Sequence, residues 1–157
     1  MTSQEILDLI SRRIDEKFNF NAELKQLYDK VKSDYQAAPF ATIRYPEAIT
    51  AENWCQMVRE VEIPPVWGNV YFIFDGNKQL LYIGRTQQIN AALKSHLIKR
   101  TSERMSSILD GLKDLVLKSD TKRIYIKTID VQPVELVGTF KSRLIYEFCP
   151  RLARRQS

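Results

Sequence analysis

The stretch WGNVYFIFDGNKQLLYIGR, residues 67–85, decides the fold. Trp67–Phe74 and Gln79–Ile83 are rich in β-branched and aromatic residues, and Asp75-Gly76-Asn77 between them is typical of a turn. This pattern predicts a β-hairpin. Further along, Arg123–Ile129 (RIYIKTI) alternates between apolar and polar residues, which predicts a third strand.

The segments before and after these strands show helical periodicity. After the hairpin, the apolar spacing predicts helices over residues 87–99, 102–118 and 133–148, the last ending before Pro150. Before the hairpin it predicts helices over residues 3–17 and 21–36, an extended connector over 37–49, and a short helix after Thr50. We therefore expect an α/β (α+β) fold, a small three-stranded sheet flanked by helices. Pro64-Pro65 marks the boundary between a helical N-terminal extension, residues 1–66, and the sheet domain, residues 67–157.

Length and composition suit one globular domain. The chain has 157 residues, of which 44% are hydrophobic and 27% charged, and these values argue against disorder and fibrous repeats. No apolar run approaches the roughly 18 residues of a membrane span, and the N-terminus lacks the apolar stretch of a signal peptide, so we expect a cytoplasmic protein without a membrane segment. Cys55, Cys149 and the lone His96 are too few and too far apart for a zinc site, and they argue against a disulfide framework.

Positive charge is concentrated in the second part of the chain. Residues 1–66 contain 8 Lys+Arg and 11 Asp+Glu, whereas residues 67–157 contain 16 and 8, a net charge of +8. Lysine and arginine neutralise phosphates without reading sequence, so this part suits a nucleic-acid backbone; the alternative is a solvated basic surface. The candidate nucleic-acid-binding residues are Arg85, Lys94, Lys99, Arg100, Lys141, Arg143 and Arg151.

The expected hairpin carries two short motifs, Asn69-Val70-Tyr71 and Tyr82-Ile83-Gly84, and the second is followed by Arg85-Thr86. Through these motifs, which stand at the first and second halves of the family signature, residues 68–153 resemble the GIY-YIG nuclease domain. His96 lies where many relatives have a helix histidine, and Leu144-Ile145 with Pro150 matches the closing pattern. The resemblance implies a three-stranded sheet, cleavage of nucleic acid with one carboxylate-bound divalent metal ion, and a remnant site at Tyr71, Tyr82 and His96.

Three positions depart from the family pattern. The catalytic arginine is replaced by Ala92, the metal-binding glutamate by Lys141, and the closing asparagine by Ala153. A protonated lysine cannot ligate magnesium and repels it. We therefore predict that no catalytic residue set is intact and that no metal is bound.

Lys141 is unusual even without the family comparison. On a helical wheel it falls inside the apolar arc of Val137, Phe140 and Leu144. A lysine at such a position either extends its ammonium to solvent or lines a cavity, and the sequence leaves both open.

The leading functional hypothesis is a catalytically inactive GIY-YIG-fold protein that binds nucleic acid, with DNA favoured, through a basic face and without a cofactor. One alternative is a metal-dependent endonuclease that uses Mg²⁺ and is either active through rearranged residues or inactivated by engineering. A second alternative is a protein-interaction module whose partner binds the N-terminal helices.

Overall fold

The computed structural model describes residues 2–17, 22–89 and 107–152. The chain forms two compact units, Met1–Ala37 and Ala38–Ser157. The first contains α1 (Ser3–Lys17) and α2 (Ala22–Ala37), as the periodicity predicts. The predicted capping box at the start of α1 is confirmed, because Glu5 N donates to Thr2 Oγ1 at 3.2 Å and Thr2 N donates to Glu5 Oε2 at 2.9 Å.

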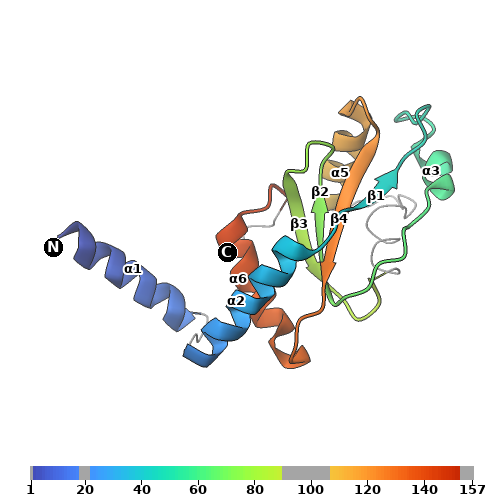
Figure 1. Ribbon diagram of the computed structural model, residues 1–157. Coiled ribbons are helices and arrows are strands. Elements are labelled where there is room, and N and C mark those ends of the chain that lie inside the picture. The colour runs from blue at the N-terminus through green and yellow to red at the C-terminus, as the bar shows by residue number, and fades with distance from the viewer. Residues whose placement is uncertain (1, 18–21, 90–106, 153–157) are drawn as a thin grey trace. The chain divides into compact units, whose positions relative to one another are not determined.

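The second unit contains a four-stranded antiparallel sheet in the order β1-β4-β2-β3 (Figure 1). Its strands are β1 (Ala41–Arg44), β2 (Val70–Phe74), β3 (Leu80–Arg85) and β4 (Arg123–Ile129). β2 and β3 form the predicted hairpin, and β4 pairs with the other side of β2. The prediction of a mixed α/β fold is confirmed.

The prediction of a three-stranded sheet is wrong, because β1 pairs with the free edge of β4. Its four residues lie opposite residues 123–126. From the sequence, residues 37–49 look like an extended connector, since four residues between two prolines are too few to show an alternating pattern. The sheet unit thus begins at Ala38, inside the segment 1–66 that we expected to form a helical extension.

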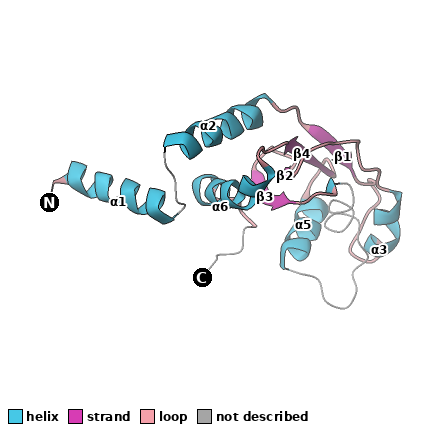
Figure 2. Cartoon of the chain, turned by 90° about the horizontal axis from the view of Figure 1, so that it is seen from below, coloured by secondary structure: helices cyan, strands magenta, loops and turns pink. Residues whose placement is uncertain are grey.

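The described helices of this unit lie around the sheet. They are α3 (Trp54–Met57), which continues into the 3₁₀ turn η1 (Val58–Glu60), α5 (Ser107–Lys118), and α6 (Val137–Phe148), which follows the 3₁₀ turn η3 (Val134–Leu136). Figure 2 shows α3 and α5 on one side of the sheet. The helix predicted over residues 87–99 lies mostly outside the described residues. None of the described helices is long and apolar enough to cross a membrane.

The core lies on both faces of β2, whose five residues are all buried. Tyr71 and Ile73 point to one face, where they join Ile126 and the side chains of α5. Successive strand residues point to opposite faces, so Phe72 faces the other side. α6 packs against the outer strand β3 and contributes the fully buried Phe140. The sheet therefore holds the end of β3 firmly beside the start of α6.

Candidate nucleic-acid interface

Tyr71 and Tyr82 lie on neighbouring strands and point to the same face of the sheet. Tyr71 pairs across the hairpin with Gly84, Tyr82 pairs with Ile73, and the two tyrosine ring centroids are 6.0 Å apart. Burial raises the pKa of Tyr71, and the charge of Tyr82 and a hydrogen bond with it raise that pKa further. Tyr71 is only 2% exposed, so its phenol is a neutral packing group.

Gly84 provides the space that the Tyr71 ring occupies. A Cβ on Gly84 would overlap Cζ and Oη of Tyr71. Paired residues of antiparallel strands point to the same face, so a side chain at position 84 would project directly into the ring. Packing alone therefore accounts for the glycine of the Tyr82-Ile83-Gly84 segment.

Two positive side chains lie together where β3 ends and α6 begins. The guanidinium of Arg85, the last residue of β3, occupies the space beside Gly138, where a Cβ would overlap its Nη1. Lys141 stands one helical turn after Gly138, on the same side of α6. Burial lowers the pKa of the Lys141 ammonium, and the positive charge of Arg85 lowers it further.

This pair is arranged to attract an anion. Within the described ranges, no carboxylate forms an ion pair with Arg85 or Lys141. Arginine can donate hydrogen bonds to two oxygens of one phosphate, and lysine contacts phosphate as a compact charge. A phosphate bound to both side chains would relieve the repulsion between them.

The same residues do not fit a divalent cation. The family resemblance places the metal-binding carboxylate at Lys141, whose ammonium repels a metal ion, and Arg85 adds a second positive charge there. Among the residues that the structure describes, no three His, Cys, Asp or Glu side chains gather as a possible ligand set. No metal-dependent step follows from this arrangement.

Arg143 and Arg151, which the structure describes, do not lie beside Arg85 and Lys141. Arg143 follows Lys141 by two residues, which places it about 200° round α6, on a different side of the helix. Arg151 lies at the opposite end of β3, where its backbone N donates to the Leu80 carbonyl at 3.3 Å. The remaining predicted residues lie outside the described part of the chain: Lys94, Lys99 and Arg100 of the binding set, and Ala92, His96 and Ala153 of the remnant site.

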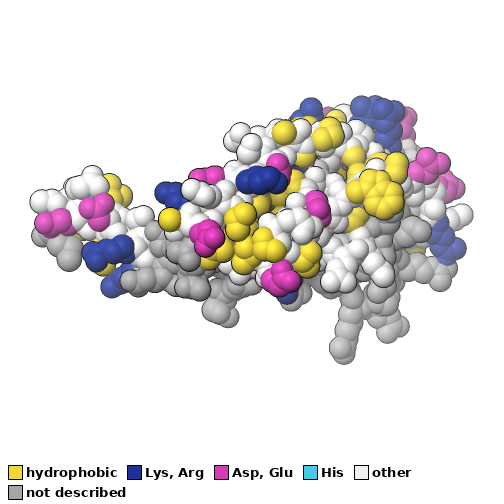
Figure 3. Space-filling model, turned by 60° about the horizontal axis from the view of Figure 1, so that its bottom comes forward, with side chains coloured by type: hydrophobic (Ala, Val, Ile, Leu, Met, Phe, Trp, Pro, Cys, Tyr) yellow, Lys and Arg dark blue, Asp and Glu magenta, His cyan; other side chains and the backbone are white. Residues whose placement is uncertain are grey.

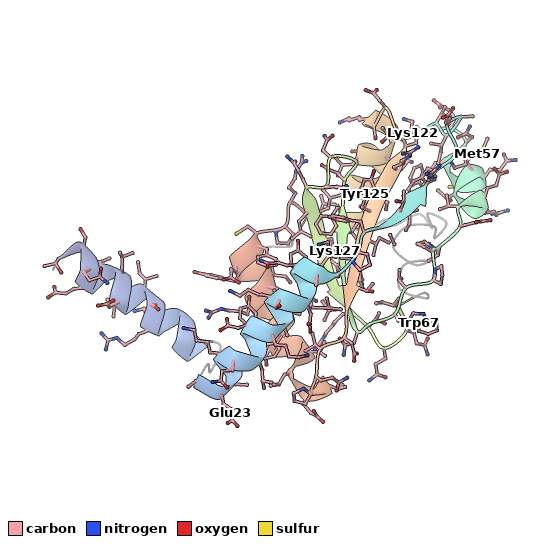
Figure 4. All side chains as sticks on the ribbon, viewed as in Figure 1. Glu23, Met57, Trp67, Lys122, Tyr125 and Lys127 are labelled. Carbon is pink, nitrogen blue, oxygen red and sulfur yellow. The ribbon has the colours of Figure 1, made fainter. Side chains whose placement is uncertain are left out.

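Two other lysines of residues 67–157, Lys122 and Lys127, have partners inside the fold (Figure 4). Lys122 Nζ donates to the carbonyls of Val116 at 3.2 Å and Leu117 at 2.5 Å, where it also faces the negative end of the α5 dipole. Lys127 is 8% exposed, and its Nζ lies 4.5 Å from the ring centroid of Phe40. The net charge of +8 therefore overstates the charge that a polyanion would meet.

A polar cavity of about 360 Å³ opens at the end of the sheet away from Arg85 and Lys141, which we call the cation pair. The turn between β2 and β3, the end of α5 and Arg151 line it. Asp75 accepts hydrogen bonds from Asn77 N and Gln79 N, and its carboxylate lies 3.6 Å from the Arg151 guanidinium. Because β3 separates this cavity from Arg85 by about 17 Å, the two places form separate sites.

Sequence reasoning missed the residue that brings the two cations together. Gly138 gives no signal beyond being a glycine near the start of a predicted helix, where glycine is a poor helix former. From the sequence, Asn69 stands out only as part of the family signature. Its side chain exchanges two hydrogen bonds with the backbone of Val131, at 2.7 and 2.8 Å, and its carbonyl accepts one from Thr86 N at 3.0 Å. Asn69 therefore ties together the chain segments that surround Arg85.

No family model matches the chain, and neither a curated protein nor a solved structure matches it. Membership of the GIY-YIG family therefore stays a prediction.

Proposed function

We propose that this protein is a catalytically inactive relative of the GIY-YIG nucleases that binds nucleic acid, with DNA as the favoured ligand. The observation that carries the proposal is the cation pair of Arg85 and Lys141 beside Gly138. In the family that the sequence resembles, a metal ion supplies positive charge at this point. An ammonium can hold a phosphate there, but it cannot lower the pKa of a bound water as a metal ion does, so binding is kept and cleavage is lost.

The charge of residues 67–157 supports the same function. Of the net charge of +5, the sequence after residue 66 contributes +8 and the part before it −3. Contacts from lysine and arginine to phosphates position a protein on the backbone without selecting a sequence. We therefore expect binding that depends steeply on salt and weakly on sequence.

We expect Lys141→Glu and Arg85→Gln each to weaken nucleic-acid binding by about tenfold or more, because a hydrogen bond to a charged group contributes about 1.5–3 kcal/mol. For each phosphate contact that is lost, the slope of log K against log salt should fall by about one. The measurement is fluorescence anisotropy with a labelled duplex and a labelled single strand of the same sequence, over a range of salt concentrations.

Lys118→Glu is the matched control, because it changes the net charge equally at an exposed position at the other end of the sheet. Equal losses in Lys118→Glu and Lys141→Glu would mean that only net charge matters, and the proposed site would be wrong. If none of the variants changes the affinity, the interaction-module alternative takes the lead, with the exposed Ile6, Leu7 and Ile10 of α1 as the next surface to test. Mg²⁺-dependent cleavage by the wild type that is lost in Tyr71→Phe would instead favour the nuclease alternative.

We expect Gly138→Ala to weaken binding without lowering stability. The new methyl group would displace the Arg85 guanidinium, which is the end of a flexible side chain and can move. Alanine favours a helix over glycine by about 1 kcal/mol, so the free energy of unfolding should stay level or rise. Urea denaturation and anisotropy on the same samples measure both quantities. Gly111→Ala in α5 is the control for affinity, and unchanged binding by Gly138→Ala would contradict the role of Arg85.

A further inference from the structure

Trp67 is the most exposed large hydrophobic side chain among the described residues. Its exposed fraction is 82%, although the sequence predicts that it begins a strand. The strand β2 starts only at Val70, so Trp67 stands in the preceding loop. A tryptophan offers a large flat ring whose burial is strongly favourable, and leaving it in water forgoes that stabilisation.

The backbone beneath this indole is held rigidly. Thr128 Oγ1 donates to the Trp67 carbonyl at 2.8 Å, and Asn69 N donates to the Ile129 carbonyl at 3.0 Å. Between them, Gly68 has a φ of 157°, and a Cβ there would lie 2.5 Å from the Ile129 carbonyl oxygen. The loop therefore runs tightly against β4 and presents the ring from a fixed position.

Trp67 and the cation pair belong to the same end of the sheet. Val70, the first residue of β2, pairs with Arg85, the last residue of β3. Two residues lie between Trp67 and Val70, so the Cα atoms of Trp67 and Arg85 are no more than about 16 Å apart. Figure 4 places Trp67 at the end of the sheet away from Lys122, and Figure 3 brings this end forward and shows hydrophobic side chains exposed on it.

We propose that this end of the sheet binds single-stranded nucleic acid, with one unpaired base stacked on the Trp67 indole and the neighbouring phosphates on Arg85 and Lys141. The inference rests on the proposed function, because the two cations hold the backbone. Sites for single strands combine a positive track for phosphates with aromatic rings for bases, and every base has a face that can stack. In a duplex the base faces are already covered, so Trp67 adds affinity only where bases are unpaired.

The two tryptophans of the chain allow a direct readout. Trp54 is 5% exposed and stacks on Tyr45 with ring centroids 5.6 Å apart, so a ligand cannot reach it without unfolding. Quenching of tryptophan fluorescence by an added oligonucleotide therefore reports on Trp67. Trp67→Phe keeps a ring that can stack, whereas Trp67→Leu keeps only the hydrophobic volume.

The experiment titrates wild type, Trp67→Phe, Trp67→Leu and Lys141→Glu with an oligothymidylate, a duplex, and a strand of equal length with abasic sites. We expect Trp67→Leu to lose about 5- to 150-fold in affinity for oligothymidylate and to bind the duplex and the abasic strand unchanged. Trp67→Phe should lose less than Trp67→Leu. The exposed Tyr146, replaced by leucine, is the aromatic control and should leave all three affinities unchanged.

The outcomes separate this inference from the proposed function. Unchanged oligothymidylate affinity in Trp67→Leu, or an equal loss for duplex and single strand, would overturn the stacking inference. If Lys141→Glu still weakens binding to all three ligands, the proposed function stands without it. If wild type binds none of the ligands, both fail, and the exposed indole would instead point to a protein partner.

Discussion

Gly84→Ala is expected to lower the free energy of unfolding of the sheet unit by about 3 kcal/mol or more, which is the upper end of the range for overpacked cores. The added methyl group would overlap Cζ, Oη and Cε1 of Tyr71. The ring has no room to move away, since Tyr71 is 2% exposed and lies in β2, which is paired on both sides. A loss of this size would unfold a domain of ordinary marginal stability at moderate temperature.

A double-mutant cycle with Tyr71→Val tests the cause of this loss. Valine removes the ring, so Gly84→Ala should cost much less in that background, with a coupling free energy of up to about 3 kcal/mol. Urea denaturation followed by circular dichroism gives the four free energies. Gly138→Ala is the matched glycine control, because its new methyl group meets only the movable end of Arg85. Additive effects of the two substitutions would contradict the placement of the Tyr71 ring over Gly84.

The second large effect is a loss of stability at alkaline pH caused by two buried tyrosines. Burial raises the pKa of both Tyr45 and Tyr71 above the value of 10.0 for a free tyrosine. Below pH 10 the phenol is protonated in both states and nothing is lost. Above pH 10 the unfolded chain releases the proton while the folded protein keeps it, so the free energy of unfolding falls by about 1.4 kcal/mol per pH unit for each tyrosine.

The variant that carries Tyr45→Phe and Tyr71→Phe should be less stable than the wild type at neutral pH, and it should lose less stability above pH 10. At neutral pH it is expected to be less stable by about 1 kcal/mol for each hydrogen bond that its missing hydroxyls made. Above pH 10 the free energy of unfolding of the variant should fall less steeply with pH than that of the wild type. The difference between the two slopes should be about 2.7 kcal/mol per pH unit for the two sites together. The two stability curves should cross within about one pH unit above 10, as measured by urea denaturation at closely spaced pH values. Parallel curves would show that the two phenols ionise as readily in the folded protein as in the unfolded chain.

Local patterns in the sequence predicted most of the elements in the described part of the chain. The alternation of Arg123–Ile129 gives β4 with the same ends in prediction and structure, and the helix predicted over residues 3–17 is α1. These predictions succeed because side-chain periodicity and capping are local properties of a helix or strand. The same reasoning correctly joined the segments Trp67–Phe74 and Gln79–Ile83 in a hairpin, since a short turn leaves few other pairings open; the strands in the structure are Val70–Phe74 and Leu80–Arg85.

The candidate site was predicted less well than the elements, because the sequence offers only individual charged residues as a guide. The sequence named Lys141 because it interrupts an apolar arc, and the structure shows it half-buried beside Arg85. It also named Arg151, whose guanidinium lies beside Asp75 at the far end of β3. Composition counts every cation equally, whereas the fold decides which of them face an anion and which already have a partner.

What the sequence determined by itself is therefore the set of strands and helices that periodicity defines, the hairpin, and the position of Lys141 inside an apolar helix arc. Only the tertiary structure decided that β1 pairs with β4, that Gly138 leaves space for Arg85 next to Lys141, and that Trp67 stays outside the strand that it was predicted to begin. Each of these depends on contacts between segments that are distant in the chain. Such contacts form because the whole sheet packs, and no local pattern of side chains encodes them.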